Sequence, residues 1–255
     1  MSLHSDLEIR PHGDHVVEVE IRRGPHNYFS PSSLRALAEA LEQLDQDPDC
    51  RAVVLCSEGR NFCAGADFGG EMAEPDAAGR LYEQAKRLFS IRTPIVAALQ
   101  GAAIGGGLGL ALAADFRVGT TATKFTANFS RLGFHHGFGL SVTLPAVVGS
   151  TRAADLLMSS RSVGGDEAFG IGLLDQLAPE NELRAAAGDY ARRFVSAAPL
   201  AVRSIKETLR AGIRGQLDAV LDRELCEQTR LRSTSDFGEG VRAANERRAP
   251  VFRGA

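Results

Sequence analysis

Two glycine-rich stretches are the places where a ligand could approach the backbone of this chain. They read GRNFCAGADFGG over residues 59–70 and GAAIGGGLG over residues 101–109. Glycine inside a helix costs roughly 0.5–1 kcal/mol relative to alanine, so three in a row indicate that something comes close to the chain. The glycines admit a ligand, or they allow a helix to pack tightly on a sheet. Nucleotide loops are excluded, because neither stretch completes GxGxxG and the chain has no GxxxxGK.

Three side chains have the chemistry for proton transfer: Glu71, directly after the first stretch, and the neighbouring pair His135 and His136 further along the chain. Imidazole titrates close to neutral pH and is the commonest general base in enzymes. Glu71 lies in the segment 69–79, where glycine, proline and acidic residues predict a mobile loop. Each candidate also has an ordinary interpretation. The histidines could be bonded to the backbone of a turn, and the glutamate could be a solvated loop acid.

The elements that must position these residues alternate between strands and helices. Apolar and β-branched residues predict strands within 16–21, 51–59 and 93–101. Helices are predicted at 30–47, with Ser30 as N-cap and Pro31 at the first helical position, and at 77–92. A strand–helix–strand connection joins parallel strands, so both glycine-rich stretches follow strands that end at one edge of the sheet. Open α/β sheets bind ligands at that edge.

After about Leu183 the strand signals stop and helical patterns follow. They cover 183–197, 199–212, 215–233 and 236–248, and the last one is predicted to begin at Asp236, with Glu239 three residues on. We therefore divide the chain into a core at 1–182 and a helical region at 183–255.

Composition limits the classes of protein to which this chain can belong. It has 255 residues, 44% hydrophobic residues and a net charge of −3, which indicates a globular protein and gives no electrostatic reason to expect nucleic acid or a membrane. The four cysteines have no CxxC spacing and no histidine cluster, so we expect a reduced, cytoplasmic protein without a metal. The uncharged run 95–114 is too rich in alanine and glycine to predict a membrane span.

The sequence resembles the crotonase (enoyl-CoA hydratase/isomerase) superfamily. The resemblance rests on FCAGADF after a strand, then on IVAALQGAAIGGGLGLALAADFRV, and it continues through RLGFHHGFGLSVTLPAVVG to the final ANERRAPVFRG. It implies an α/β fold, a spiral of ββα turns with a C-terminal helical region that forms trimers, often paired into hexamers. It also implies an acyl-CoA substrate, fatty acid metabolism, and no cofactor beyond the coenzyme A of the substrate.

The resemblance also implies a site for the thioester. The backbone N–H groups of Ala66 and Gly106 match the family's oxyanion hole, which donates to the thioester oxygen when an enolate forms. Gly106 adds the positive end of a helix that begins there. Ala64, Asp67 and Gly105 match positions that line the substrate. Arg23 matches a basic residue near the coenzyme A phosphates, and its ordinary interpretation is a surface arginine.

The carboxylates that the family uses for proton transfer are missing. The two glutamates of the hydratases align with Gly109 and Phe129, and the acid of many isomerases and hydrolases aligns with Gly137. Standard hydration is therefore expected to be slow. Three functions stay open: a lyase or isomerase that uses histidine or water, a thioester or C–C hydrolase of the same fold, and a catalytically weak acyl-CoA binder or partner subunit.

Overall fold

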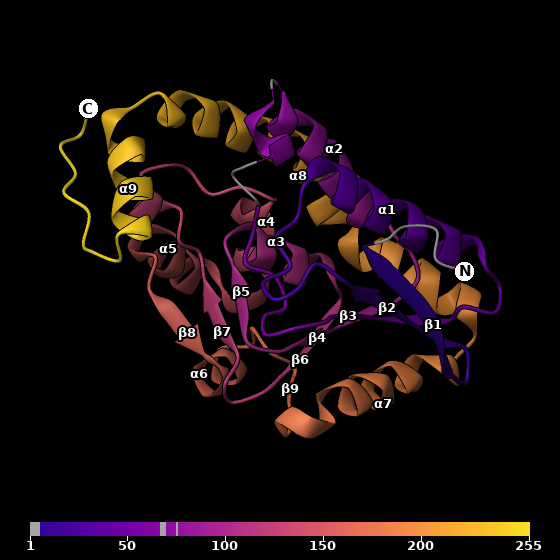
Figure 1. Ribbon diagram of the computed structural model, residues 1–255. Coiled ribbons are helices and arrows are strands. Elements are labelled where there is room, and N and C mark those ends of the chain that lie inside the picture. The colour runs from indigo at the N-terminus through magenta and orange to yellow at the C-terminus, as the bar shows by residue number, and fades with distance from the viewer. Residues whose placement is uncertain (1–5, 67–69, 75) are drawn as a thin grey trace.

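The computed structural model describes residues 6–66, 70–74 and 76–255, and a six-stranded sheet lies at its centre (Figure 1). The strand order is β1-β2-β3-β4-β6-β9. β1 is antiparallel to β2, and each following pair is parallel. The strands are β1 Leu7–Gly13, β2 Val16–Ile21, β3 Ala52–Ser57, β4 Ile95–Leu99, β6 Phe116–Gly119 and β9 Gln176–Leu177.

Two crossover helices produce the parallel pairs that lead to the glycine-rich stretches. α1 (Pro31–Gln46) connects β2 to β3, and α2 (Ala77–Leu88) connects β3 to β4. Ser30 is the N-cap of α1 and accepts a hydrogen bond from the Ser33 N–H, with Pro31 in the first turn. These features confirm the predicted strands, both predicted helices and the parallel crossover.

A smaller sheet in the order β5-β7-β8 extends the spiral beyond β4. An isolated parallel bridge between Cys63 and Ala103 joins the loop after β3 to β5, so the two glycine-rich stretches run side by side. The predicted fold class is confirmed, a mixed α/β spiral with a helical C-terminal region. The remaining elements of this part are β5 Ala102–Ile104, β7 Lys124–Thr126, β8 Ser162–Gly164, α3 Gly106–Ala113, α4 Leu140–Val148, α5 Ser150–Ser159, α6 Gly165–Gly170 and the short 3₁₀ turns η1 Gly70–Ala73, η2 Ser130–Leu132 and η3 Glu180–Glu182.

The central sheet is covered on both faces. Alternate residues of a strand point to opposite faces, so Val53 and Leu55 pack in the cluster that includes α1 and α2, whereas Val54 packs with residues of α7 (Leu183–Val195). Figure 1 shows α7 below the sheet and α1 and α2 above it. α7 therefore belongs to the layers of the core, although it lies beyond the boundary drawn at 182. That boundary stays a prediction.

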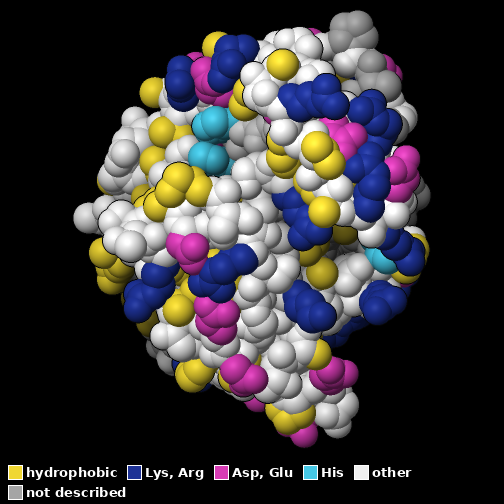
Figure 2. Space-filling view, turned by 90° about the vertical axis from the view of Figure 1, so that its left-hand side faces the viewer, with side chains coloured by type: hydrophobic (Ala, Val, Ile, Leu, Met, Phe, Trp, Pro, Cys, Tyr) yellow, Lys and Arg dark blue, Asp and Glu magenta, His cyan; other side chains and the backbone are white. Residues whose placement is uncertain are grey.

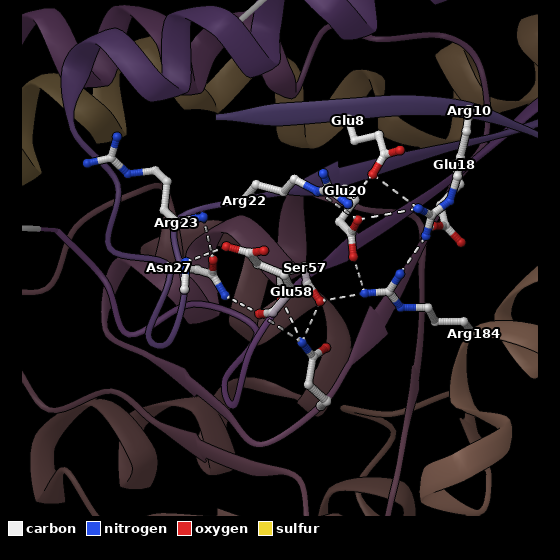
Figure 3. A network of polar contacts seen from close by, with 12 residues as sticks. Glu8, Arg10, Glu18, Glu20, Arg22, Arg23, Asn27, Ser57, Glu58 and Arg184 are labelled. Atoms are coloured by element: carbon white, nitrogen blue, oxygen red, sulfur yellow. Dashed lines mark hydrogen bonds and ion pairs between the residues drawn. The ribbon is translucent and has the colours of Figure 1, made fainter. Parts of the chain in front are cut away.

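Arg184 of α7 fixes this helix to the edge of β2. Its guanidinium pairs with Glu20 and with Glu18, at 3.4 Å for the latter, and donates to the Ser57 carbonyl at 2.9 Å (Figure 3). Glu18 and Glu20 are buried, and Arg10 from β1 pairs with both of them. Buried carboxylates need such partners, because removing one cation would leave an uncompensated charge.

The C-terminal region differs from the sequence prediction in two places. The stretches 199–212 and 215–233 form one continuous helix, α8 (Pro199–Arg232), which passes through Gly212 and Gly215. The last helix, α9 (Ser235–Asn245), has Thr234 as its N-cap, so the prediction of Asp236 was wrong. The Thr234 side chain accepts from the Phe237 N–H, while the Asp236 carboxylate accepts from backbone N–H groups of the C-terminal tail. None of the helices in the described ranges is long and apolar enough to cross a membrane.

Candidate active site

One pocket brings together four of the residues predicted to hold the substrate. Ala64 and Ala66 from the loop after β3 line it, together with Gly105 and Gly106 at the start of α3. Its walls are largely apolar, and four phenylalanines contribute to them: Phe29, Phe129, Phe134 and Phe138. Within the described residues no group of three or more His, Cys, Asp or Glu side chains could hold a metal ion. The pocket therefore combines an apolar cavity with backbone N–H groups.

Local hydrogen bonds hold the loop that carries Ala66 beside α3. The side chain of Asn27 is buried and donates to the carbonyls of Glu58 and Asn61, at 2.7 Å each (Figure 3). The Phe29 N–H donates to the Gly65 carbonyl at 3.0 Å. These bonds fix the loop after β3 against the segment that leads into α1.

Gly106 lines the pocket and is the first residue of α3. As the first residue of the helix, Gly106 has an N–H group with no partner inside the helix. A Cβ added to Gly65 would lie 3.7 Å from the Gly106 nitrogen, so the two loops meet closely at this point. An anionic oxygen in the pocket would gain from this amide and from the positive end of the helix.

Contacts and backbone conformation within the protein explain why Gly105, Gly106 and Gly107 carry no side chains. A Cβ on Gly106 would lie 2.5 Å from Cζ of Phe29, and one on Gly107 would overlap the Cys63 carbonyl. Gly105 has a φ of +55°, a conformation that favours glycine. Tight internal packing, one of the two interpretations left open by the sequence, therefore accounts for the glycines.

At Gly109, Phe129 and Gly137, where the family resemblance expected carboxylates, other side chains occupy the space. A Cβ on Gly109 would lie 2.6 Å from the Cβ of Phe138, and one on Gly137 would overlap the Tyr82 hydroxyl. Phe129 itself lines the pocket and packs on its aromatic neighbours. The absence of acids is therefore built into the packing, and a glutamate restored at Gly109 alone would not fit.

The His135–His136 pair lies beside the pocket, and neither imidazole is among the described residues that line it. The two rings are stacked with centroids 4.1 Å apart. The Ser141 hydroxyl donates to the buried Glu224 carboxylate at 2.7 Å, so the contact of 2.8 Å between His136 Nε2 and Ser141 Oγ requires a proton on Nε2. His136 is thus held by a buried network, and its catalytic role stays a prediction.

Burial, reinforced by the neighbouring imidazole of His135, lowers the pKa of His136 to about 4. A base with this pKa would stay active well below the value of ~6.5 expected for an unperturbed imidazole. An unperturbed histidine base would lose activity as the pH falls through ~6.5, and this expectation does not apply to His136.

The same shift predicts a dependence of stability on pH. Between pH ~6.5 and about 4 the unfolded chain binds a proton at His136 and the folded chain does not, so the free energy of unfolding falls as the pH falls. Between pH 7 and pH 4.5 we expect the free energy of unfolding to fall by about 2 kcal/mol more in the parent than in His136→Asn. Urea unfolding at a series of pH values measures it.

Burial raises the pKa of Glu224, and this shift makes the free energy of unfolding change with pH in the opposite direction. Both proteins contain Glu224, so the difference between their pH dependences isolates the contribution of the histidine. Equal pH dependence in both proteins would contradict the burial of a neutral His136.

Two other predicted residues, Glu71 and Arg23, are not among the described residues that line the pocket. The Glu71 carboxylate accepts hydrogen bonds from the Ser32 hydroxyl and N–H and from the Ser30 hydroxyl at the N-terminus of α1, and these bonds, the first above all, lower its pKa. The Arg23 guanidinium pairs with Asp6 and donates to the Tyr28 carbonyl at 2.7 Å. Asp67 lies outside the described residues. Roles for Glu71 and Arg23 stay predictions.

Sequence reasoning missed the polar side chains that do line the pocket. Tyr82 from α2 and Gln228 and Arg232 from α8 contribute to its wall, as does Asn128. Tyr82 occupies the buried face of α2 with Leu81 and Ala85, and this helical spacing was a signal for its burial. Its approach to Gly137 had no sequence signal, because the two residues lie on elements far apart in the chain.

Comparison with known proteins defines the class of this protein. The sequence model described as enoyl-CoA hydratase/isomerase matches residues 12–255, so the chain belongs to this family. It is 32% identical over 249 residues to the (E)-benzylidenesuccinyl-CoA hydratase of Thauera aromatica, which covers 95% of this chain and 97% of that relative.

Two further similarities support the assignment. The 1,2-epoxyphenylacetyl-CoA isomerase of Escherichia coli is 30% identical, over 89% of this chain and 90% of its own length. Among solved structures, an enoyl-CoA hydratase/isomerase from Pseudoalteromonas atlantica superimposes with a TM-score of 0.89 at 29% identity, over 98% of this chain and 100% of that one.

Proposed function

We propose that this protein binds an acyl-CoA thioester with its carbonyl oxygen between the N–H groups of Ala66 and Gly106 and stabilises the enolate that forms. The observation that carries the proposal is the meeting of these two residues in one apolar pocket, with Gly106 at a helix N-terminus. Preorganised N–H donors favour an enolate oxygen over a neutral thioester because negative charge gathers on that oxygen. The phenylalanine walls suit an apolar acyl group.

The reaction differs from standard hydration in this proposal. Gly109 and Phe129 supply neither the base nor the acid that water addition uses, and Phe138 fills the space beside Gly109. The names of two relatives, a hydratase and an isomerase, give different reactions on CoA thioesters at similar levels of identity. A shared enolate with different proton transfer explains how one family supports both.

A panel of acyl-CoA thioesters tests the proposal. Crotonyl-CoA, acetoacetyl-CoA and butyryl-CoA are each incubated with the protein, and both acyl products and free thiol are measured. We expect binding of the panel and chemical change in at least one acyl group with its thioester intact. Release of free coenzyme A would instead indicate a hydrolase, and binding without any product would indicate a binding subunit.

We propose that the chain assembles as a homotrimer or hexamer. Leu200, Ile205 and Leu209 of α8 are 79%, 58% and 78% exposed, and an exposed apolar group of this kind marks an interaction surface. Light scattering at micromolar concentration should give the mass of three or six chains. Leu209→Glu should lower that mass, whereas Thr208→Glu, in the same exposed turn, should not. A parent protein that is monomeric would contradict the proposal.

The remaining expectations on partners and location also stay proposals. Lys and Arg side chains gather on the face over α9 and the C-terminal tail (Figure 2). Some of this charge is balanced, because Arg242 and Arg248 both pair with Glu239. We therefore propose no nucleic acid partner and no membrane partner. The cysteines are free thiols, which supports a reducing, cytoplasmic location.

A further inference from the structure

Tyr82 places a hydroxyl group inside the pocket at a position where the family resemblance expected an acid. The side chain is 5% exposed and extends from α2 into the pocket wall. Its oxygen lies so close to Gly137 that a Cβ on that glycine would overlap it. A carboxylate at position 137 and the Tyr82 hydroxyl would therefore compete for one space.

The surroundings of Tyr82 keep the hydroxyl protonated and hold it in place. Burial raises the pKa of Tyr82, and the charge of Glu224 adds to this effect. A hydrogen bond with the Phe138 backbone and the nearby Arg232 guanidinium act in the opposite direction, so they stabilise a tyrosinate that exists only briefly. The group is thus a neutral donor whose conjugate base has two stabilising neighbours.

We propose that Tyr82 is the proton donor that converts the bound enolate into product. The inference rests on the proposed function, since it requires an enolate whose oxygen is held by Ala66 and Gly106. Tyr82, Ala66 and Gly106 line the same pocket, and the Tyr82 hydroxyl lies beside Gly137, another residue of its lining. Of the described side chains that line it, Tyr82 bears a neutral hydroxyl, whereas Arg232 is a cation.

The step balances without an added oxidant or metal. The Tyr82 O–H bond breaks and a C–H bond forms at the α-carbon. The electron pair of the enolate C=C bond makes this new bond, and the thioester C=O bond is restored. The tyrosinate left behind takes a proton from water after the product leaves. Because a neutral tyrosine is a weak base, it does not start a reaction by removing an α-proton.

This limits the class of reaction. A site with a proton donor and no carboxylate base can protonate an enolate that forms without removal of an α-proton. Such an enolate arises by addition of a nucleophile to the β-carbon of an enoyl-CoA, or by cleavage of a bond at the α-carbon. Double-bond migration begins by proton removal and is disfavoured. The substrate is therefore a thioester that reaches the enolate by addition or cleavage.

Acetoacetyl-CoA tests the assignment without knowledge of the natural substrate, because its enolate can be prepared in alkaline solution. The enolate is mixed with excess protein at neutral pH in a stopped-flow instrument. Protonation on oxygen gives the enol, so the loss of both enolate and enol absorbance reports protonation at carbon. Three proteins are compared: the parent, Tyr82→Phe, and Tyr190→Phe as matched control. Tyr190 lies on α7 beneath Arg193, on the other side of the central sheet. Equilibrium dialysis gives the dissociation constant of each.

We expect the parent and Tyr190→Phe to accelerate protonation, and Tyr82→Phe to lose about 10²–10⁴-fold of that acceleration with an unchanged dissociation constant. Equal acceleration by Tyr82→Phe, or a parent that binds and does not accelerate, would overturn the assignment while leaving thioester binding intact. A parent that does not bind the thioester would instead overturn the proposed function.

Discussion

Gly106→Pro is expected to lower kcat/KM by about 10²–10³-fold relative to Gly106→Ala, for whichever acyl-CoA the parent converts. Proline removes the N–H group that is proposed to donate to the enolate oxygen. Position 106 is the first residue of α3, where proline is compatible with the helix because its missing N–H has no helical partner. The loss should appear mainly in kcat, since the bond strengthens as the enolate forms.

The alanine variant is the matched control for this experiment. Both substitutions place a Cβ against the Phe29 ring, at 2.5 Å from Cζ before any adjustment, so they share this contact, and proline adds the CH2 groups of its ring on the nitrogen. Only proline removes the donor. If the two variants had the same kcat/KM and both were folded, the Gly106 N–H would have no part in the reaction.

The parent is expected to hydrate crotonyl-CoA several orders of magnitude more slowly than an enzyme with both glutamates. A positioned base contributes about 10²–10⁴-fold, and neither Gly109 nor Phe129 supplies the base that water addition needs, even where Tyr82 donates the proton to the α-carbon. Gly109→Glu alone should not restore hydration, because the Phe138 side chain occupies the space. Overpacking of this kind costs about 1–3 kcal/mol of stability.

A double variant separates missing chemistry from missing space. Gly109→Glu combined with Phe138→Gly gives the new side chain room, because glycine also removes the Phe138 Cβ and suits the φ of +63° at this position, and Phe138→Gly alone is its control. The rate of hydration is measured as the loss of the enoyl absorbance. We expect this rate to be higher in the double variant than in either single variant. Fast hydration by the parent itself would contradict the alignment of Gly109 and Phe129 with the family glutamates.

Local signals in the sequence predicted most of the elements, although the N-cap of α9 was an exception. The N-cap at Ser30, the parallel crossovers and the two glycine-rich loops at one sheet edge follow from short patterns, and the structure confirms them. Local patterns also predicted the helical C-terminal region. They did not predict that α8 is continuous, because Gly212 and Gly215 resemble a break but the helix is held by tertiary contacts such as Lys206 to Asp115.

The interior of the site could not be predicted from spacing alone. Tyr82 meets Gly137, and Glu224 reaches Ser141, only because α2, α4 and α8 converge in space. His135 and His136 were the natural candidates for proton transfer from their residue type. The structure places them next to the pocket in a buried network, and it places a tyrosine hydroxyl inside.

A crystal structure with a bound, unreactive acyl-CoA tests the central claim most directly. The claim is that the thioester oxygen lies between the Ala66 and Gly106 amides. The account predicts that this oxygen lies about 2.7–3.1 Å from both nitrogens, with the α-carbon facing the Tyr82 hydroxyl. A thioester that binds in this pocket with its oxygen outside hydrogen-bond distance of either amide, or that binds elsewhere on the protein, would contradict it.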